Sequence, residues 1–406
     1  MAVTDETEAT APSAAGDPDE SRVAQLVEQL LAECPPDTTP EREFLGRQFD
    51  LGLAWVQFPE GKGGLGLSPK LNRTWMTRIA TAKGPIGGVK NPIGYGMCAP
   101  AVLAHGTDEQ HQLLRPLFTN EHIWCQLFSE PGAGSDVASL AMRAERDGDE
   151  WSVNGQKVWT TLAHISRYGL LIARTDPEQP KHRGITAFIV DMEAPGVDTR
   201  PLRQMTGEAE FNEVYFTDVR IPDSMRVDEV GRGWGVSITT LMNERVSIGG
   251  GTPPRNSGPI GQLLALWEQA GVTDPAMRDE LVRLWVGAEV NRLTNMRAAA
   301  GRKLGTPGPE GSVSKLAMAE LNKRIYDFAM NVMGAEGMLF SSYAMHQPKT
   351  ALFGEDLSKN FLRARANSIE GGTSEVMKNI LGERVLGLPG DVRVDKELPW
   401  SKVPRS

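Results

Sequence analysis

The chain has 406 residues, 40% of them hydrophobic, so it is long enough for two or three domains with sizeable cores, and global disorder is excluded. Its net charge is −9 without a basic stripe, so no nucleic-acid partner is expected. No apolar run reaches the roughly 18 residues of a membrane span, and the acidic start lacks a secretion signal, so we expect a cytoplasmic protein.

The first 122 residues divide into a tail and a helical region. Residues 1–20 are rich in Asp, Glu, Ala, Pro and Ser, which predicts a disordered tail. In residues 21–122, helical stretches alternate with Gly/Pro breaks such as residues 61–64 and 83–85. The first of these stretches places apolar residues at helical spacing. They are Val23, Leu26, Val27, Leu30 and Leu31.

The pattern changes at residue 123 and stays β-like to residue 232. Short apolar runs lie at 151–153, 168–173, 186–190 and 213–216, with turn residues between them. The dipeptide Asn154-Gly155 predicts a tight hairpin turn. We therefore expect a small antiparallel β domain and not an alternating βα unit.

Helical periodicity returns in residues 233–390, where the segments 277–301 and 312–334 are long enough for bundle helices. Residues 391–406 are predicted to be a second tail. The fold class is therefore α+β, with an N-terminal helical domain, a central antiparallel β domain and a C-terminal four-helix bundle.

The chain has three cysteines, Cys34, Cys98 and Cys125. They show neither CxxC spacing nor clustered histidine partners, which argues against a zinc site and against a disulfide framework. We interpret them as small core residues in a reducing compartment.

Three strings carry the chemistry of the chain. Residues 127–136 read LFSEPGAGSD, a glycine-rich turn that lets backbone N–H groups approach a ligand, with Ser129 and Ser135 as hydroxyl donors. Residues 154–161 read NGQKVWTT, and residues 369–376 read IEGGTSEV. With their spacing and the order of helices, sheet and helices, these strings resemble the signatures of the acyl-CoA dehydrogenase family over roughly residues 21–390.

The resemblance implies a fold of acyl-CoA dehydrogenase type, FAD as cofactor and an acyl-CoA as substrate. Ser129 and the backbone around Phe128 should meet the flavin ring, Trp159 should pack beside it, and Thr161 should hydrogen-bond near its N5 edge. By itself Trp159 would be interpreted as an ordinary core tryptophan. Ser135 should lie near the pantetheine arm. The full cofactor set is Phe128, Ser129, Gly134, Ser135, Trp159, Thr161, Thr373 and Glu375, the last two near the phosphate and ribose.

The reaction needs a strong base, because the proton α to a thioester carbonyl is weakly acidic. Family members carry that base in one of two places. One corresponds here to Gly371, which has no side chain and is expected to line the substrate site. The other is a glutamate in a Glu-Arg pair on a C-terminal helix, which predicts Glu244 as the base. Glu370 is the fallback, and Arg245 is expected to anchor the helix or meet the substrate.

Two segments depart from the family pattern. An Arg-x-x-Phe-Gly segment, whose arginine binds the FAD of a neighbouring subunit, has no counterpart in residues 262–271, and Arg255 is a weak echo that comes too early. Residues 331–338 replace a Gln-x-x-Gly-Gly-x-Gly segment that also reaches the neighbour's FAD. Both departures concern contacts made across a subunit interface. We therefore predict a second dehydrogenase-like subunit that supplies them in a heterotetramer, with a homo-oligomer as the alternative.

Several interpretations remain open at this stage. The expected product is a trans-2-enoyl-CoA, with an electron-transferring flavoprotein as acceptor and a fatty or bulky acyl group, such as a steroid side chain, as substrate. The alternatives are a non-catalytic subunit that completes a partner's FAD site, and an acyl-CoA oxidase or flavin monooxygenase on the same fold. A local basic pair, Arg363 and Arg365, either meets an anionic cofactor or lies on a solvated face. Structural packing is the favoured role of Tyr95 and His105.

Overall fold

The computed structural model describes residues 17–249, 253–303, 310–348, 356–390, 392 and 395–404. The chain separates into two compact units, residues 1–87 and 88–406, and each is described by itself.

The first unit is helical. Helix α1 (Pro18–Glu33) starts at Asp17, whose side chain accepts a hydrogen bond from the Asp19 amide, so the helix begins inside the segment predicted to be a tail. Of the five apolar residues predicted on its inner face, Val23, Val27 and Leu30 are fully buried. The remaining helices of this unit are α2 (Glu41–Asp50) and α3 (Asn72–Thr81).

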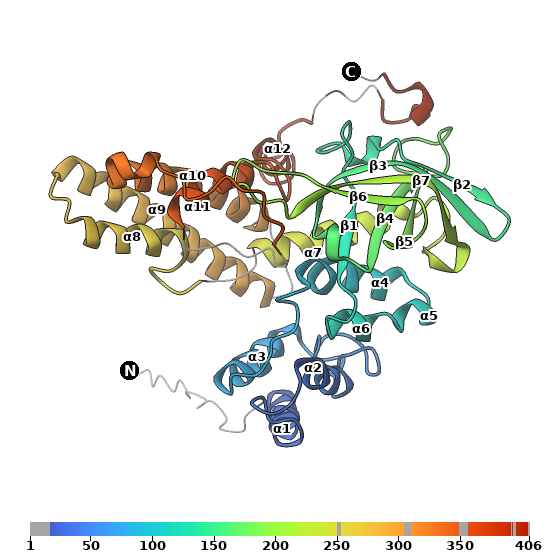
Figure 1. Cartoon of the computed structure of the whole chain (residues 1–406), viewed down its shortest axis with the longest axis horizontal. Coiled ribbons are helices and arrows are strands. Elements are labelled where there is room, and N and C mark those ends of the chain that lie inside the picture. Colours follow the sequence, from blue (N-terminus) through green and yellow to red (C-terminus); the bar gives the residue numbers. More distant parts are fainter. Residues whose placement is uncertain are drawn as a thin grey trace, which may run out of the picture. The chain divides into compact units, whose positions relative to one another are not determined.

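The second unit opens with short helices and continues into an eight-stranded sheet (Figure 1). A π-helical turn over Gly94–Cys98 leads into α4 (Ala99–His105), α5 (Asp108–His111) and α6 (Leu114–Phe118). The strands are β1 (Trp124–Leu127), β2 (Arg143–Asp147), β3 (Glu150–Thr161), β4 (Tyr168–Arg174), β5 (Ile185–Asp191), β6 (Val197–Pro201), β7 (Phe211–Pro222) and β8 (Arg226–Val227).

The predicted antiparallel β domain is confirmed in its main part. The strand order is β6-β7-β3-β2-β4-β5-β8, and the long pair β3–β7 runs antiparallel. Two pairings, β1 with β4 and the short contact of β2 with β4, are parallel. Alternate residues of these strands form an apolar core that includes Trp151, Leu171, Phe188, Val190 and Val214.

The hairpin turn predicted at Asn154-Gly155 is wrong. Both residues lie inside β3, where the register with β7 shifts between Val153 and Gly155. Gly155 has φ +147°, and a Cβ there would come within 3.0 Å of Met142, so the glycine serves a bulge and a close approach. The turn lies earlier, between Asp147 and Glu150, where Gly148 adopts φ +64°.

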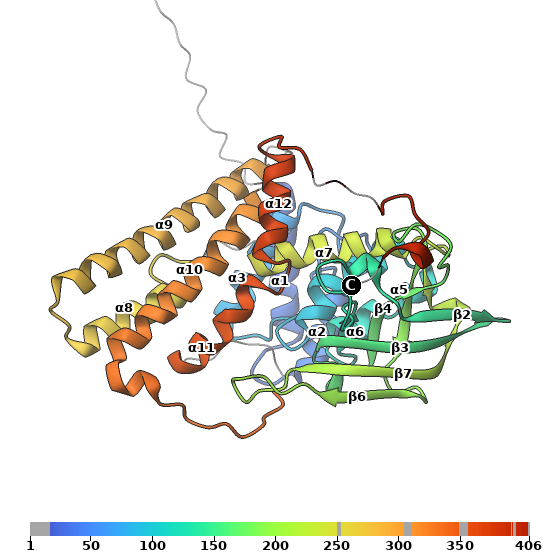
Figure 2. The same cartoon turned by 90° about the horizontal axis from the view of Figure 1, so that it is seen from above.

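The rest of the second unit is the predicted helical bundle. It consists of α7 (Gly233–Gly249), α8 (Gly258–Ala270), α9 (Pro275–Lys303), α10 (Glu310–Met333), α11 (Leu357–Arg363) and α12 (Ser374–Arg384). Helices α9 and α10 contain the two long helices predicted from periodicity. Helix α10 packs against α7, α8, α9, α11 and α12, and Figure 2 shows α8, α9 and α10 side by side. Their shared core includes Ile260, Leu263, Leu284, Ile325 and Phe328.

Residues beyond α12 do not all form a free tail. A 3-10 turn over Trp400–Lys402 lies against the β domain, where Pro399 pairs with Pro180. The predicted domain boundaries at 122/123, 232/233 and 390/391 remain predictions. No helix in the described ranges is long and apolar enough to cross a membrane.

Candidate active site

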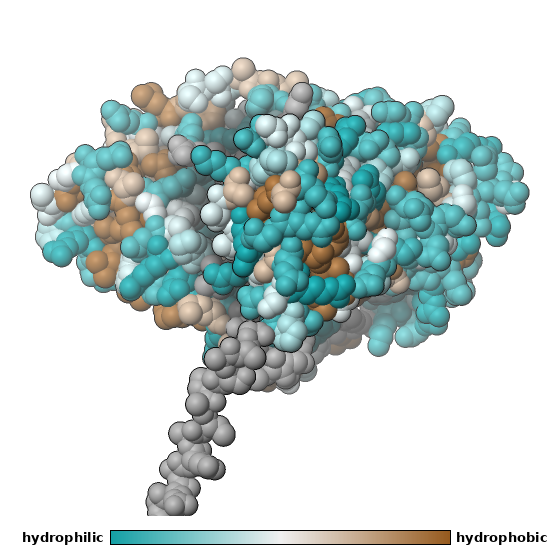
Figure 3. All heavy atoms as spheres, turned by 90° about the horizontal axis from the view of Figure 1, so that it is seen from below, coloured by the Kyte–Doolittle hydropathy of each residue, from teal (hydrophilic) through white to brown (hydrophobic). Residues whose placement is uncertain are grey.

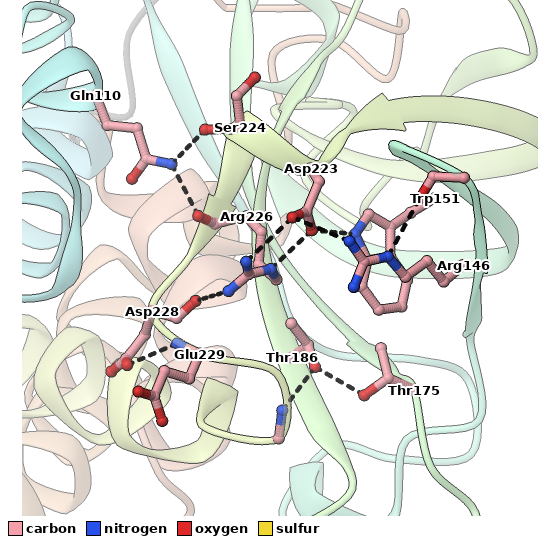
Figure 4. A network of polar contacts seen from close by, with 12 residues as sticks. Gln110, Arg146, Trp151, Thr175, Thr186, Asp223, Ser224, Arg226, Asp228 and Glu229 are labelled. Carbon is pink, nitrogen blue, oxygen red and sulfur yellow. Dashed lines mark hydrogen bonds and ion pairs between the residues drawn. The ribbon is translucent and has the colours of Figure 1, made fainter.

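A polar network fixes the segment that leads from the sheet into α7 (Figure 4). The Asp223 carboxylate accepts from Trp151 Nε1 at 2.8 Å and from Arg226 Nε at 2.8 Å. These hydrogen bonds lower the pKa of Asp223 to about 2. Gln110, in α5, donates to the backbone carbonyls of Ser224 and Arg226, both at 2.8 Å. The segment of residues 223–226, which precedes α7, is therefore held from both sides.

Helix α7 is pinned along its first half. A Cβ on Gly233 would meet the backbone of Thr186 at 2.6 Å, so only glycine lets the helix begin so close to β5. His105 bridges Asp228 (Nδ1, 2.8 Å) and Thr239 (Nε2, 2.9 Å), which gives this histidine the structural role favoured from the sequence. Further along α7, Glu244 is half-buried.

Buried Lys315, on α10, is a cation that interacts electrostatically with both candidate bases. Only 4% of Lys315 is exposed, and its ammonium group donates to the carbonyls of Asn367 (2.8 Å) and Gly372 (2.6 Å). Burial lowers the pKa of Lys315, and the negative charges of Glu370 and then Glu244 oppose that shift. The structure thus brings the Glu-Arg helix and the C-terminal signature to one cation, which the sequence did not reveal.

Both carboxylate oxygens of Glu370 accept hydrogen bonds from neighbouring side chains. Arg363 donates to it in a bidentate pair at 3.1 and 2.8 Å, and Asn367 Nδ2 donates to Oε1 at 3.1 Å. The next residues, Gly371 and Gly372, have φ +61° and +93°. That turn needs glycine, and Lys315 holds its far end through the Gly372 carbonyl.

Arg363 links the C-terminal signature to the sheet. It is 14% exposed, and besides Glu370 it lies 5.7 Å from the ring centroid of Phe211, on β7. Phe211 in turn meets Trp159 edge-to-face, with ring centroids 5.8 Å apart. Of the basic pair noted in the sequence, Arg363 belongs to the site, whereas Arg365 pairs with Asp327 at 2.9 Å.

Trp159 is an exposed side chain and not a core tryptophan. It is 57% exposed, although it lies in a sheet whose other tryptophans, Trp124 and Trp151, are buried. Its φ of +60° is uncommon for a large side chain and indicates a constrained position. Half-buried Thr161 follows on the same strand, and the described residues offer no hydrogen-bond partner to the buried Thr160 Oγ1. An exposed ring beside an unused polar atom fits a flat, polar-edged cofactor.

The glycine-rich loop is anchored to β3 by a buried ion pair. Lys157 Nζ lies 2.8 Å from Glu130 Oε1 and donates to the Phe128 carbonyl at 3.0 Å, while Val158 N donates to the Ser129 carbonyl at 2.9 Å. Lys157 is fully buried and Glu130 is 9% exposed. Burial lowers the pKa of Lys157. Phe128 is buried and Ser129 half-buried below the exposed tip, which carries Gly134 and Ser135.

The start of α12 holds the last two predicted cofactor residues. Thr373 caps the helix, its hydroxyl accepting from Val376 N at 3.1 Å, and Glu375 is exposed in the first turn. A helix N-terminus favours an anion, whereas the carboxylate of Glu375 opposes one. The phosphate end of a cofactor is therefore less well matched here than its ring end.

The structure describes both segments that depart from the family pattern. Arg255 stacks over the Trp285 ring at 5.0 Å and lies 3.6 Å from Glu289, with its side chain 59% exposed. Residues 331–338 cover the end of α10 and a 3-10 turn in which Met338 is 83% exposed. The side chain of Arg245 lies outside the described residues, as does the side chain of Ser247.

Sequence reasoning missed the residues that hold the site together. Glu130 and Lys157 lie inside the strings quoted above. An acid in one string and a base in the other, each next to apolar residues, is a signal from which their ion pair could have been predicted. Lys315 and its carbonyl partners leave no comparable pattern, because the contact joins residues 52 and 57 positions apart.

Three family models match consecutive parts of the chain. They describe the N-terminal domain (residues 20–121), the middle domain (125–219) and the C-terminal domain (231–386) of acyl-CoA dehydrogenases.

Similar proteins are found among mycobacterial enzymes. Acyl-CoA dehydrogenase IpdE1 of Mycobacterium tuberculosis is 36% identical over 84% of this chain and 86% of its own length. Acyl-CoA dehydrogenase FadE34 of the same organism is 39% identical over 84% of this chain, which spans only 45% of that relative.

Solved structures agree with these similarities. The ChsE4–ChsE5 complex from Mycobacterium tuberculosis has a chain 29% identical with a TM-score of 0.68, covering 93% of this chain and 100% of that one. The structure described as the Tcur3481–Tcur3483 steroid ACAD contains a chain that is 25% identical to this one, with a TM-score of 0.69. The match covers 93% of this chain and 99% of that chain.

Proposed function

The chain belongs to the acyl-CoA dehydrogenase family of FAD-binding flavoproteins, and on that premise we propose that it oxidises the Cα–Cβ bond of an acyl-CoA to a trans-2-enoyl-CoA with Glu244 as its base. One observation carries the assignment of the base. Glu370, the nearest carboxylate in the alternative position, has both oxygens bound by Arg363 and Asn367. Taking a proton there would weaken a partly buried bidentate ion pair.

The chain's residues fit FAD at the ring end. Trp159 offers an exposed aromatic face, Thr161 and Ser129 offer polar atoms beside it, and the loop with Gly134 and Ser135 leaves room for a ligand. Phe128, Thr373, Glu375 and Gly371 complete the proposed binding set. Bound FAD supplies the two-electron acceptor that takes a hydride from Cβ.

The protein's own part is a proton transfer with a fixed geometry. The Glu244 carboxylate takes the Cα proton, and the electron pair of that C–H bond becomes the new C=C bond as the Cβ hydride leaves. Lys315 places a positive charge near Glu244 and holds the turn at Gly371 and Gly372 through the Gly372 carbonyl. The half-buried setting of Glu244 reduces competition from water.

Two matched variants test the base. Glu244→Gln removes the carboxylate without changing its shape, and we expect the rate of anaerobic flavin reduction by acyl-CoA to fall by about 10²–10⁴-fold. Glu370→Gln should reduce stability more than rate, because it leaves Arg363 partly unpaired. Unchanged flavin reduction in Glu244→Gln would refute the assignment, and the proton would then be taken by Glu370 or at a partner's site that this chain only completes. Peroxide formed when the reduced enzyme meets air would favour an oxidase.

A second, unequal subunit is part of the proposal. The arginine that family members lend to a neighbour is missing, and Arg255 is already paired with Glu289. A pyrophosphate dianion needs a cation or well-aimed donors, so two copies of this chain would leave every site short of one. The similar solved structures named above are each titled as a pair of proteins.

An apolar stripe on α9 supports the same proposal. Helix α9 buries Leu281 and Leu284 in the bundle and also carries apolar residues on its outer side. A helix that is apolar on both sides is normally covered on both. Figure 3 shows apolar residues reaching the surface over the bundle. The outer set is Val282, Val286, Val290, Leu293 and Met296, each 46–57% exposed.

The finer assignments follow the relatives and are part of the same proposal. We propose a bulky acyl group such as a steroid side chain, since one similar structure is described as a steroid ACAD. An electron-transferring flavoprotein is the proposed acceptor, and the cytoplasm is the proposed location. A screen of CoA thioesters against the chain with and without its candidate partner tests substrate and partner together. Full FAD binding and turnover by the chain alone would refute the unequal pair.

A further inference from the structure

The C-terminal segment, residues 395–404, folds back onto the β domain and not into solvent (Figures 1 and 2). Trp400 N donates to the Gln179 carbonyl and Ser401 N to the Pro177 carbonyl, both at 2.9 Å. Pro399 pairs with Pro180. The segment, which we call the strap, therefore lies along the connection between β4 and β5.

Trp400 closes over a buried arginine that holds the base of the glycine-rich loop. The Arg174 guanidinium lies 4.8 Å from the Trp400 ring centroid and is 2% exposed. It donates to the carbonyls of Ala138 (2.6 Å) and Leu140 (3.2 Å). Trp400 Nε1 itself donates to the Ser139 carbonyl at 3.2 Å. The strap therefore contacts the loop's base directly and through Arg174.

Lys181 ties the strap to the loop by charge. Its ammonium group lies 2.8 Å from Asp136, the last residue of the loop string, and 2.8 Å from Asp395, in the strap. The Lys181 side chain is 14% exposed, so solvent screens these pairs only in part. Asp136 also accepts from Ser139 Oγ at 2.6 Å. Asp136 is thus fixed from both the strap side and the base of the loop.

The exposed tip of the loop, Gly134 and Ser135, has little packing of its own, whereas Ala133 below it is buried and exchanges two 3.0 Å backbone hydrogen bonds with Glu130. A Cβ added at Gly132 or Gly134 would meet no heavy atom within 4 Å, and Ser135 is exposed. Such a segment loses backbone entropy when it binds a ligand, unless other contacts order it beforehand. We propose that the strap, acting through Lys181 and Trp400, preorganises this loop for the CoA thioester, with Lys181 as a positioning residue. The ligand's identity rests on the proposed function, whereas the strap's hold on the loop does not.

Electrostatics point the same way. A CoA thioester is a polyanion, so a loop that ends in an unneutralised Asp136 would repel it. Lys181 offsets one of the two negative charges that Asp136 and Asp395 carry together. Losing Lys181 should therefore weaken ligand binding as well as loosen the loop.

The test compares full-length FAD-loaded Trp400→Ala and Lys181→Met with the conservative variants Trp400→Phe and Lys181→Arg. Lys402→Ala, at an exposed position inside the strap, is the matched control. Hydrogen exchange of peptides covering residues 131–140 should speed up by about tenfold or more in the first two variants and stay near wild type in the other three. Unchanged exchange there, or equally faster exchange in β5, overturns the inference.

The ligand arm uses coenzyme A itself and the best acyl-CoA found. We expect KM and the dissociation constant for coenzyme A to rise about tenfold in Trp400→Ala and Lys181→Met, with kcat within about twofold. A fall in kcat with unchanged KM overturns the positioning role. If the wild-type protein binds no coenzyme A, the proposed function fails, and the exchange measurement still decides whether the strap orders the loop.

Discussion

Removing the Lys157 ammonium should destabilise the site from within. Lys157→Met keeps an unbranched apolar side chain one atom shorter, and it leaves Glu130 buried without its cation and the Phe128 carbonyl without its donor. Breaking a buried ion pair from one side costs about 3–5 kcal/mol. Glu130 keeps two backbone donors, Ala141 N at 2.7 Å and Met142 N at 3.0 Å. We therefore expect a loss near the lower limit, about 3 kcal/mol.

Amide hydrogen exchange gives the residue-level measurement, because unfolding of a chain with several domains need not be two-state. The amides of Ala141 and Met142 donate to Glu130, so they report on its position. A loss of about 3 kcal/mol should speed their exchange by roughly 10²-fold. Glu145→Gln, which breaks an exposed pair with Arg143 on the neighbouring strand, is the control and should leave both amides unchanged.

A double-mutant cycle decides whether the two charges are coupled. Glu130→Gln removes the partner charge, and in the double variant the buried site holds no uncompensated ion. The double variant should therefore be less destabilised than the sum of the single variants by about 1–3 kcal/mol. Strictly additive effects, or a loss below about 1 kcal/mol for Lys157→Met, would refute the view that this pair anchors the loop.

Three further predictions concern other parts of the molecule. Trp159→Ala should weaken FAD binding by up to about tenfold, with the melting temperature of the FAD-free protein unchanged, since the ring is largely exposed; normal FAD retention would contradict its ligand-facing role. Folding lowers the pKa of Asp223 to about 2, so the stability that the ionised carboxylate contributes is present above about pH 4 and is lost as the pH falls toward 2. In thermal melts, the stability difference between wild type and Asp223→Asn should therefore shrink from pH 7 to pH 3. Val286→Arg should lower the native mass of the complex with the partner subunit, whereas Arg283→Gln on the same helix should not; an unchanged mass in Val286→Arg would remove α9 from the interface.

Local patterns were sufficient for the class of fold and for the family. The periodicities of residues 277–301 and 312–334 predicted α9 and α10, and the alternating runs predicted the main strands of the sheet. Such patterns succeed because each element buries one side against a shared core. Asn154-Gly155 misled because a dipeptide shows only its local preference for a turn. The pairing of β3 with β7 continues through it, so the glycine becomes part of a bulge.

The candidate site was predictable only as a set of separate strings. Trp159, Ser129 and Glu244 could be predicted because each lies in a short motif of residues that are adjacent in the sequence. The groups that organise them come from distant positions: Lys315 reaches the turn at Gly372, and Lys181 joins the loop to the strap.

By itself, the sequence determined the family, the order of domains and the residue types that can take a proton and face a flavin. Only the tertiary structure decided that Glu370 is occupied by Arg363, that Trp159 is exposed, and that the C-terminal segment packs on the β domain. Ion pairs and hydrogen bonds depend on distances of a few ångströms between residues far apart in the chain, and periodicity does not encode those distances.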